Sequence, residues 1–131
     1  NIGDAGLTAL IDGLVHAELS THLSTLDLSR NMIGPNGIKA LLAQVKRRAF
    51  DELRELRLDG NPLKSAGVAS VVDIVCTAKC TALSLCDSGL DIVSGRHIAQ
   101  LLARWPGLCQ LSLDANLPVL AKGIADNKTM I

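Results

Sequence analysis

Residues 23–37 read LSTLDLSRNMIGPNG, and this stretch decides the fold. Leu26 and Leu28 alternate with polar residues, which is the period of a strand with one buried face. Asn31 follows where the chain must turn, and its amide can bond backbone groups that the turn leaves unpaired. Farther on, Leu41 and Val45 are spaced four residues apart, as on one face of a helix. The stretch and its continuation therefore combine a short strand, a turn and a helix.

The same pattern recurs along the chain. The strand leucines Leu26, Leu56, Leu83 and Leu111 are 30, 27 and 28 residues apart. One strand and one helix cannot bury either apolar face alone, so the copies must stack and share a core. We predict strands near 24–28, 54–58, 81–85 and 109–113 in one parallel sheet. Helices are expected near 37–47, 67–77 and 95–104 on the opposite side.

Further positions repeat in phase with these leucines. The predicted core pairs of the helices are Leu10 with Leu14, Leu41 with Val45, Val71 with Val75, and Leu120 with Ile124. Glycines 3, 6, 34, 37 and 67 suit tight turns and close backbone approach. Ser88 stands where an asparagine is expected, so we predict that the ladder of turn asparagines is interrupted and locally looser there.

These positions divide the chain into repeats. We predict a partial repeat at 1–22, repeats at 23–52, 53–79 and 80–107, a shortened repeat at 108–129, and the start of a further repeat at 130–131. Met130 would be the first leucine position of that further repeat, and an irregular cap is the alternative for this tail. We recognise no polar capping unit, so we expect a piece of a longer array.

The pattern resembles the leucine-rich repeat family, in its ribonuclease-inhibitor-like subclass. The resemblance lies in L-x-x-L-x-L-S-x-N-x-I-G-x-x-G, as Leu23 to Gly37 spell it, and in the period of 27 to 30 residues. It implies an α/β solenoid, a segment of a right-handed horseshoe with a parallel sheet on the concave side and helices outside. Members of this family inhibit enzymes, act on small GTPases, serve as sensor modules of immune receptors, or belong to cytoskeletal and ciliary assemblies.

Composition argues against several functions. The 13 basic and 13 acidic residues balance, so no overall field favours nucleic acid or an anionic membrane as partner. No apolar run approaches the roughly 18 residues of a spanning helix. Four cysteines are too few for a disulfide scaffold, which favours a reducing, cytoplasmic compartment, with cytoskeletal or ciliary association as an option.

The residues that could carry chemistry do not form a site. Cys76, Cys80, Cys86 and Cys109 are expected to point in different directions, which does not suit tetrahedral zinc. His16, His22 and His97 are scattered, and no nucleophile shares a predictable face with them. We therefore predict no catalytic residue, no metal and no cofactor.

Two other features have structural explanations. Trp105 aligns with the last core position of the other helices, so we expect it to be buried. The basic run of Lys46, Arg47 and Arg48 falls at a helix end, where the helix dipole and solvation account for it. Nucleic-acid binding by this run is a minor option.

The outward strand positions form the candidate binding site. With the leucines inward, their polar neighbours lie on the solvated face of the sheet. Asp27 and Arg57 are in register and could pair, although an exposed pair contributes little. The candidate partner-binding residues are Thr25, Asp27, Ser29, Glu55, Arg57, Asp59, Ser84, Cys86, Gln110, Ser112 and Asp114.

The sequence and the resemblance together favour a non-enzymatic module that binds a protein partner through the concave sheet and flanking surfaces. One alternative is a GTPase-activating protein of the Ran type. The resemblance transfers no catalytic role, because a GTPase-facing surface cannot be aligned residue by residue. A GTP hydrolysis assay separates these two. Another alternative is an architectural subunit of a large cytoskeletal, ciliary or other assembly.

Overall fold

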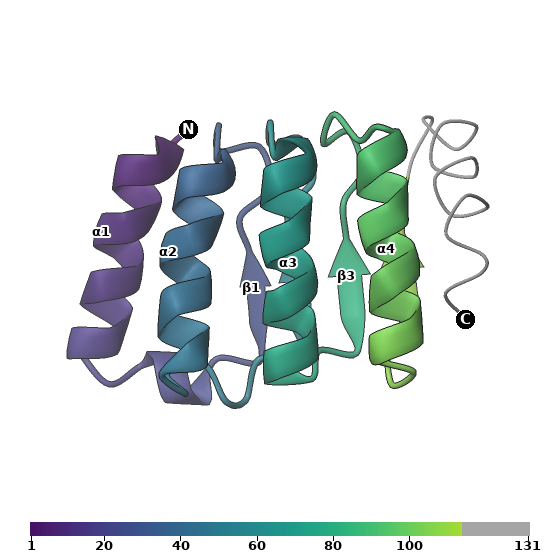
Figure 1. The fold of residues 1–131 in the computed structure, drawn as a ribbon. Coiled ribbons are helices and arrows are strands. Elements are labelled where there is room, and N and C mark those ends of the chain that lie inside the picture. Colours follow the sequence, from purple (N-terminus) through teal and green to yellow (C-terminus); the bar gives the residue numbers. More distant parts are fainter. Residues whose placement is uncertain (114–131) are drawn as a thin grey trace.

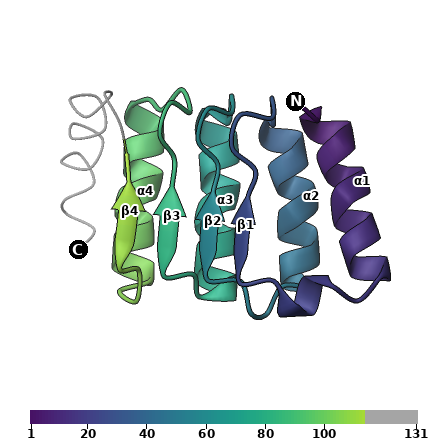
Figure 2. The same cartoon turned by 180° about the vertical axis from the view of Figure 1, so that it is seen from behind.

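The computed structural model describes residues 1–113, which form two layers (Figures 1 and 2). In chain order the elements are α1 (Gly3–His16), the 3-10 helix η1 (Ser20–His22), β1 (Thr25–Asp27), α2 (Pro35–Lys46), β2 (Glu55–Arg57), α3 (Lys64–Ala78), β3 (Ala82–Ser84), α4 (Ile92–Arg104) and β4 (Gln110–Ser112). The α-helices cover one side of the sheet and leave the other side open. This is an α/β fold.

The four strands form one parallel sheet in the order β1-β2-β3-β4. Leu26, Leu56, Leu83 and Leu111 lie in register across it. Each strand is parallel to the last because the intervening helix returns the chain to the same edge of the sheet. The predicted strands, their direction and the opposite placement of the helices are confirmed.

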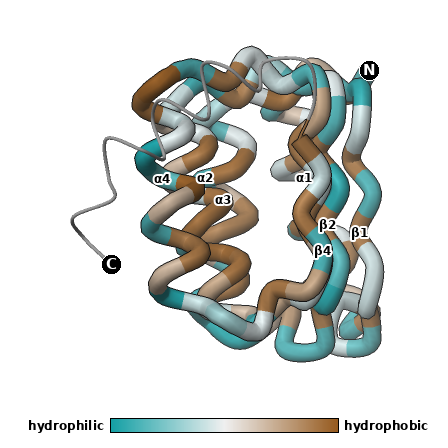
Figure 3. The backbone as a smooth tube through the Cα atoms, turned by 90° about the vertical axis from the view of Figure 1, so that its right-hand side faces the viewer, coloured by the Kyte–Doolittle hydropathy of each residue, from teal (hydrophilic) through white to brown (hydrophobic). Residues whose placement is uncertain are grey.

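The core lies between the two layers, which Figure 3 shows edge-on. Leu56 on β2 and the helix residues Leu41 and Val71 are completely buried there. Phe50 is the one fully buried aromatic side chain in the described part of the chain, so the core is otherwise aliphatic. Burial of these side chains supplies the main favourable term for folding.

Helix α1 differs from the predicted pattern. Leu7 and Ile11 are its buried residues, whereas Leu10 is 42% exposed and Leu14 is partly exposed. The prediction of Leu10 and Leu14 as a core pair is therefore wrong for Leu10. Figure 1 shows the reason: α1 packs on α2, and within residues 1–113 no strand lies opposite α1.

The helices begin two to three residues before the predicted positions, at Pro35, Lys64 and Ile92. Gly37 and Gly67 consequently lie inside helices and do not form the turns. Close approach explains Gly37, because a Cβ there would lie 2.6 Å from Asp4 Oδ1. Asp4 needs this space, since its Oδ1 accepts a hydrogen bond from the Gly34 amide at 2.7 Å at the start of α2. Among the five glycines predicted for turns, Gly3 has a left-handed φ of +67°.

The turn asparagines connect neighbouring repeats. Asn61 Oδ1 accepts hydrogen bonds from the Asn31 and Ile33 amides at 2.9 and 3.0 Å. Its Nδ2 donates to Leu28 O and Leu58 O. Ser88 continues part of this ladder, because its buried Oγ lies 3.2 Å from both Leu58 O and Cys86 O. The predicted interruption is thus partial, since the serine hydroxyl takes over a donor role of the amide.

Several predictions fall outside the described residues. These are Asp114, the Leu120 and Ile124 pair, Met130, and the repeat boundaries beyond residue 113. Within residues 1–113, every helix is too short or too polar to cross a membrane.

Candidate protein-binding face

The side of the sheet that faces away from the helices carries the candidate site. We call it the open sheet face and define it by the outward residues of its strands and strand ends: Thr25, Asp27, Ser29, Glu55, Arg57, Asp59, Ala82, Ser84, Cys86, Gln110 and Ser112. The strand period places these side chains opposite the core leucines. Figure 2 shows this side of the sheet in front of the helices.

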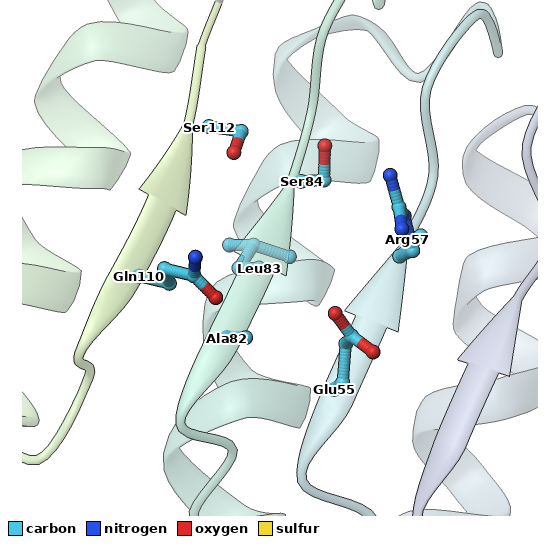
Figure 4. Close-up of a pocket in the computed structure, with 7 residues that line it drawn as sticks. All are labelled: Glu55, Arg57, Ala82, Leu83, Ser84, Gln110 and Ser112. Atoms are coloured by element: carbon cyan, nitrogen blue, oxygen red, sulfur yellow. The ribbon is translucent and has the colours of Figure 1, made fainter.

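A shallow depression of about 110 Å³ lies on this face. Side chains of three neighbouring strands line it (Figure 4): Glu55 and Arg57 from β2, Ala82, Leu83 and Ser84 from β3, and Gln110 and Ser112 from β4. The parallel register brings them together, because Arg57, Ser84 and Ser112 occupy equivalent places, as do Glu55, Ala82 and Gln110. The depression is thus lined by an acid, a base, an amide and two hydroxyls.

Asp59 organises the region beyond the end of β2. Its Oδ1 accepts hydrogen bonds from Ser84 Oγ at 2.6 Å and from the Cys86 amide at 2.8 Å. Ser84 is consequently only 8% exposed, although it lies on the open face. The prediction of a solvated Ser84 is wrong in this respect, because the neighbouring carboxylate and side chains cover it. Cys86 is half-buried.

Asp27 is exposed and lies at the edge of the sheet. Its Oδ1 accepts a hydrogen bond from the Ser29 amide at 3.1 Å. The pKa of Asp27 is lowered below its ordinary value. The Ser29 hydroxyl is the largest cause, the Ser29 amide is the second, and the positive charge of Arg57 has a weaker effect. Of the two Ser29 groups the amide has the geometry of a hydrogen bond, whereas the buried Ser29 Oγ has no partner in such geometry.

The anticipated pairing of Asp27 with Arg57 does not form a salt bridge. Among the ion pairs of residues 1–113, none within 4 Å joins these two side chains. Thr25 Oγ1 instead donates a long hydrogen bond of 3.4 Å to Glu55 Oε2. Arg57 therefore remains exposed and forms no ion pair within residues 1–113.

The other chemical candidates do not assemble into a site. All four cysteines are free, and burial raises the pKa of the Cys80 thiol to about 11. No group of three potential metal ligands occurs in the part of the chain that the structure describes. Trp105 is half-buried at the end of α4, and its Nε1 donates to Cys80 O at 2.6 Å. Its predicted burial is thus partial.

The predicted partner-binding residues include the polar lining of the depression but neither Ala82 nor Leu83. The alternation of apolar and polar residues assigned Leu83 to the core, where it is 2% exposed. It also lines the depression, because its neighbours Ala82 and Ser84 are small. Two small residues flanking a strand leucine are the sequence signal for such a hollow.

Comparison with known proteins supports the repeat. A family model described as Leucine Rich repeat matches residues 19–42, which include η1, β1 and the first part of α2. This match supports a leucine-rich repeat family for this stretch. Repeats of this family generally mediate protein–protein interactions and are typically non-enzymatic. No curated protein matches the chain.

Proposed function

We propose that this chain is a non-enzymatic recognition module that binds a protein partner through the open sheet face. The observation that carries the proposal is the depression formed in register by three successive strands. In this proposal the stacked units are a ribonuclease-inhibitor-like solenoid with the sheet on the concave side of a horseshoe. The module acts in the cytoplasm, with cytoskeletal or ciliary assemblies as a further setting.

The size of the depression favours a macromolecular partner over a small molecule. Small-molecule pockets usually enclose roughly 300–1,000 Å³ and are mostly apolar. The depression measures about 110 Å³ and has polar groups on all three of its strands. Such a shallow polar surface fits the side chains of another protein, with Arg57 and Glu55 forming charge-assisted hydrogen bonds.

The area of the open sheet face indicates that the partner also contacts flanking surfaces. Four strands about 4.8 Å apart and roughly 15 Å long give a projected area on the order of 250–300 Å². A specific interface takes about 800 Å² from each partner. Neighbouring repeats or the helical flank must therefore contribute to a tight complex.

The proposal is tested by a charge swap that preserves net charge. The variant Glu55→Lys with Arg57→Glu reverses both charges in the depression. The matched control is Asp12→Lys with Lys39→Glu, two exposed residues on α1 and α2. Proteins retained from a cell extract by the unmodified chain and by each variant are quantified by mass spectrometry, and a retained protein is then purified and titrated by calorimetry.

We expect at least one purified partner to bind the unmodified chain and the control with similar affinity. The swap in the depression should weaken this binding by roughly tenfold or more, because reversed charges are placed opposite the partner's own charges. If the control variant loses the partner and the depression variant keeps it, binding takes place on the helical side and the proposal is wrong.

A further inference from the structure

A second surface lies at the edge where α1, α2 and α3 end, which is the lower edge in Figure 1. Lys46 is the last residue of α2, and Arg47 and Arg48 follow it. Lys79 directly follows α3. All four side chains are exposed. We call these four residues the basic edge.

Two hollows adjoin along this edge. One, of about 440 Å³, is lined by Arg47 and Arg48 together with Glu18 and residues of η1. The other, of about 360 Å³, is lined by Lys46, Arg48 and Lys79 together with Asp51. Arg48 contributes to both hollows, so a ligand in one can continue past this side chain into the other.

Positive charge is in excess at this edge although the chain is neutral overall. Arg48 Nε lies 3.1 Å from Asp51 Oδ2, so these two charges offset each other. Among the ion pairs within residues 1–113, none involves Lys46, Arg47 or Lys79. In the lining of the two hollows, Glu18 is the one acidic residue left to offset the charges of these three bases.

The backbone holds two of these bases at equivalent places in neighbouring repeats. Arg48 and Lys79 both have left-handed φ values, 68° and 64°. Their amides donate to Val45 O and Val75 O at the ends of α2 and α3. A helix end of this kind usually carries glycine, which adopts the left-handed conformation without steric cost. The two bases are thus fixed one repeat apart along the edge.

We propose that the basic edge binds an extended acidic segment of a protein partner, at a surface separate from the open sheet face. Charge complementarity carries the inference, because spaced bases in two connected hollows match carboxylates spaced along an extended chain. Glu18 and Asp51 lie among the bases and disfavour the continuous row of phosphates on a nucleic acid. A partner can engage this edge and the open sheet face together.

The test measures binding of a fluorescein-labelled peptide of alternating glutamate and serine to the 131-residue chain by fluorescence anisotropy. The edge variant is Arg47→Gln with Lys79→Gln, and the matched control is Lys39→Gln with Lys64→Gln. Both remove two exposed positive charges, but the control removes them from α2 and from the start of α3, away from both hollows and from the open sheet face. A DNA duplex and phosphatidylserine vesicles are titrated as competing anionic ligands, and circular dichroism checks that each variant is folded.

We expect saturable peptide binding that the edge variant weakens roughly tenfold and the control leaves unchanged. Binding should weaken as the ionic strength rises to about 0.15 M, because exposed charges are screened. Equal losses in both variants, or no peptide binding at low salt, overturn the proposal. Tighter binding of the DNA or the vesicles than of the peptide, lost in the edge variant, also overturns it, because the edge would then serve another class of partner.

Discussion

At the scale of single residues, Asn61 joins two neighbouring repeats. It is 1% exposed and bonds backbone groups of two repeats. Removing its amide leaves buried donors and acceptors unpaired, each at a cost of about 1–3 kcal/mol. We predict that Asn61→Ala lowers the free energy of unfolding by about 3 kcal/mol, measured by urea denaturation.

Two further variants make the Asn61 prediction specific. Asn61→Ser should lose less than the alanine variant, because Ser88 shows that a hydroxyl can bond the carbonyl of the preceding repeat. Asn36→Ala serves as control, since Asn36 is exposed in α2 and should change stability by less than about 0.5 kcal/mol. Equal midpoints for Asn61→Ala and Asn36→Ala would show that the asparagine ladder does not hold the repeats together.

At the scale of elements, the start of α4 depends on Asp91. Its Oδ1 accepts hydrogen bonds from the Ser94 amide at 2.8 Å and from the Ser94 hydroxyl at 2.9 Å. The Ser94 amide is the main cause that lowers the pKa of Asp91 below its ordinary 3.8. We predict that Asp91→Ala destabilises the chain by about 1 kcal/mol at neutral pH, as expected for loss of an N-cap.

The same contact predicts a pH dependence. Because folding lowers the pKa of Asp91, its stabilising effect is fully present above 3.8 and is lost as the pH falls through the lower folded-state value. The difference in unfolding free energy between the unmodified chain and Asp91→Ala should therefore shrink in acid. The exposed Asp12→Ala in α1 provides the control. A difference that stays constant from neutral pH into acid would argue against a cap by the carboxylate.

At the scale of the whole molecule, the uncovered side of α1 predicts self-association. Leu10 is 42% exposed, whereas Leu41, which has the equivalent place in α2, is completely buried. We predict that the 131-residue chain self-associates through this side, because the association removes apolar surface from water. Leu10→Lys should shift the chain toward monomer in sedimentation velocity, and the exposed Leu102→Lys on α4 should not. Monomeric behaviour of the unmodified chain across the concentration range would refute this prediction.

The sequence was sufficient for the sheet and for the faces of its strands. Leu26, Leu56, Leu83 and Leu111 lie in the predicted register because one period of alternation, repeated in phase, is satisfied by a single stacking of the copies. For the same reason Glu55, Arg57, Ser84, Gln110 and Ser112 could be assigned to one face before their contacts were known. The helix starts were less accurate, because Gly37 and Gly67 suit either a turn or a close helix contact.

The sequence by itself thus determined the repeat, the parallel order of the strands and the side of the sheet on which each residue lies, since these follow from local periodicity. Only the tertiary structure decided which of those residues are exposed to water. Leu10 and Leu41 are equivalent in sequence, and Ser84 and Ser112 are equivalent in register, yet one member of each pair is buried and the other exposed. The physical reason is that burial depends on what lies opposite. Leu41 packs in the core between the two layers, whereas within residues 1–113 no strand lies opposite α1, and Ser84 donates a hydrogen bond to the Asp59 carboxylate. Such contacts join residues that are far apart in the sequence.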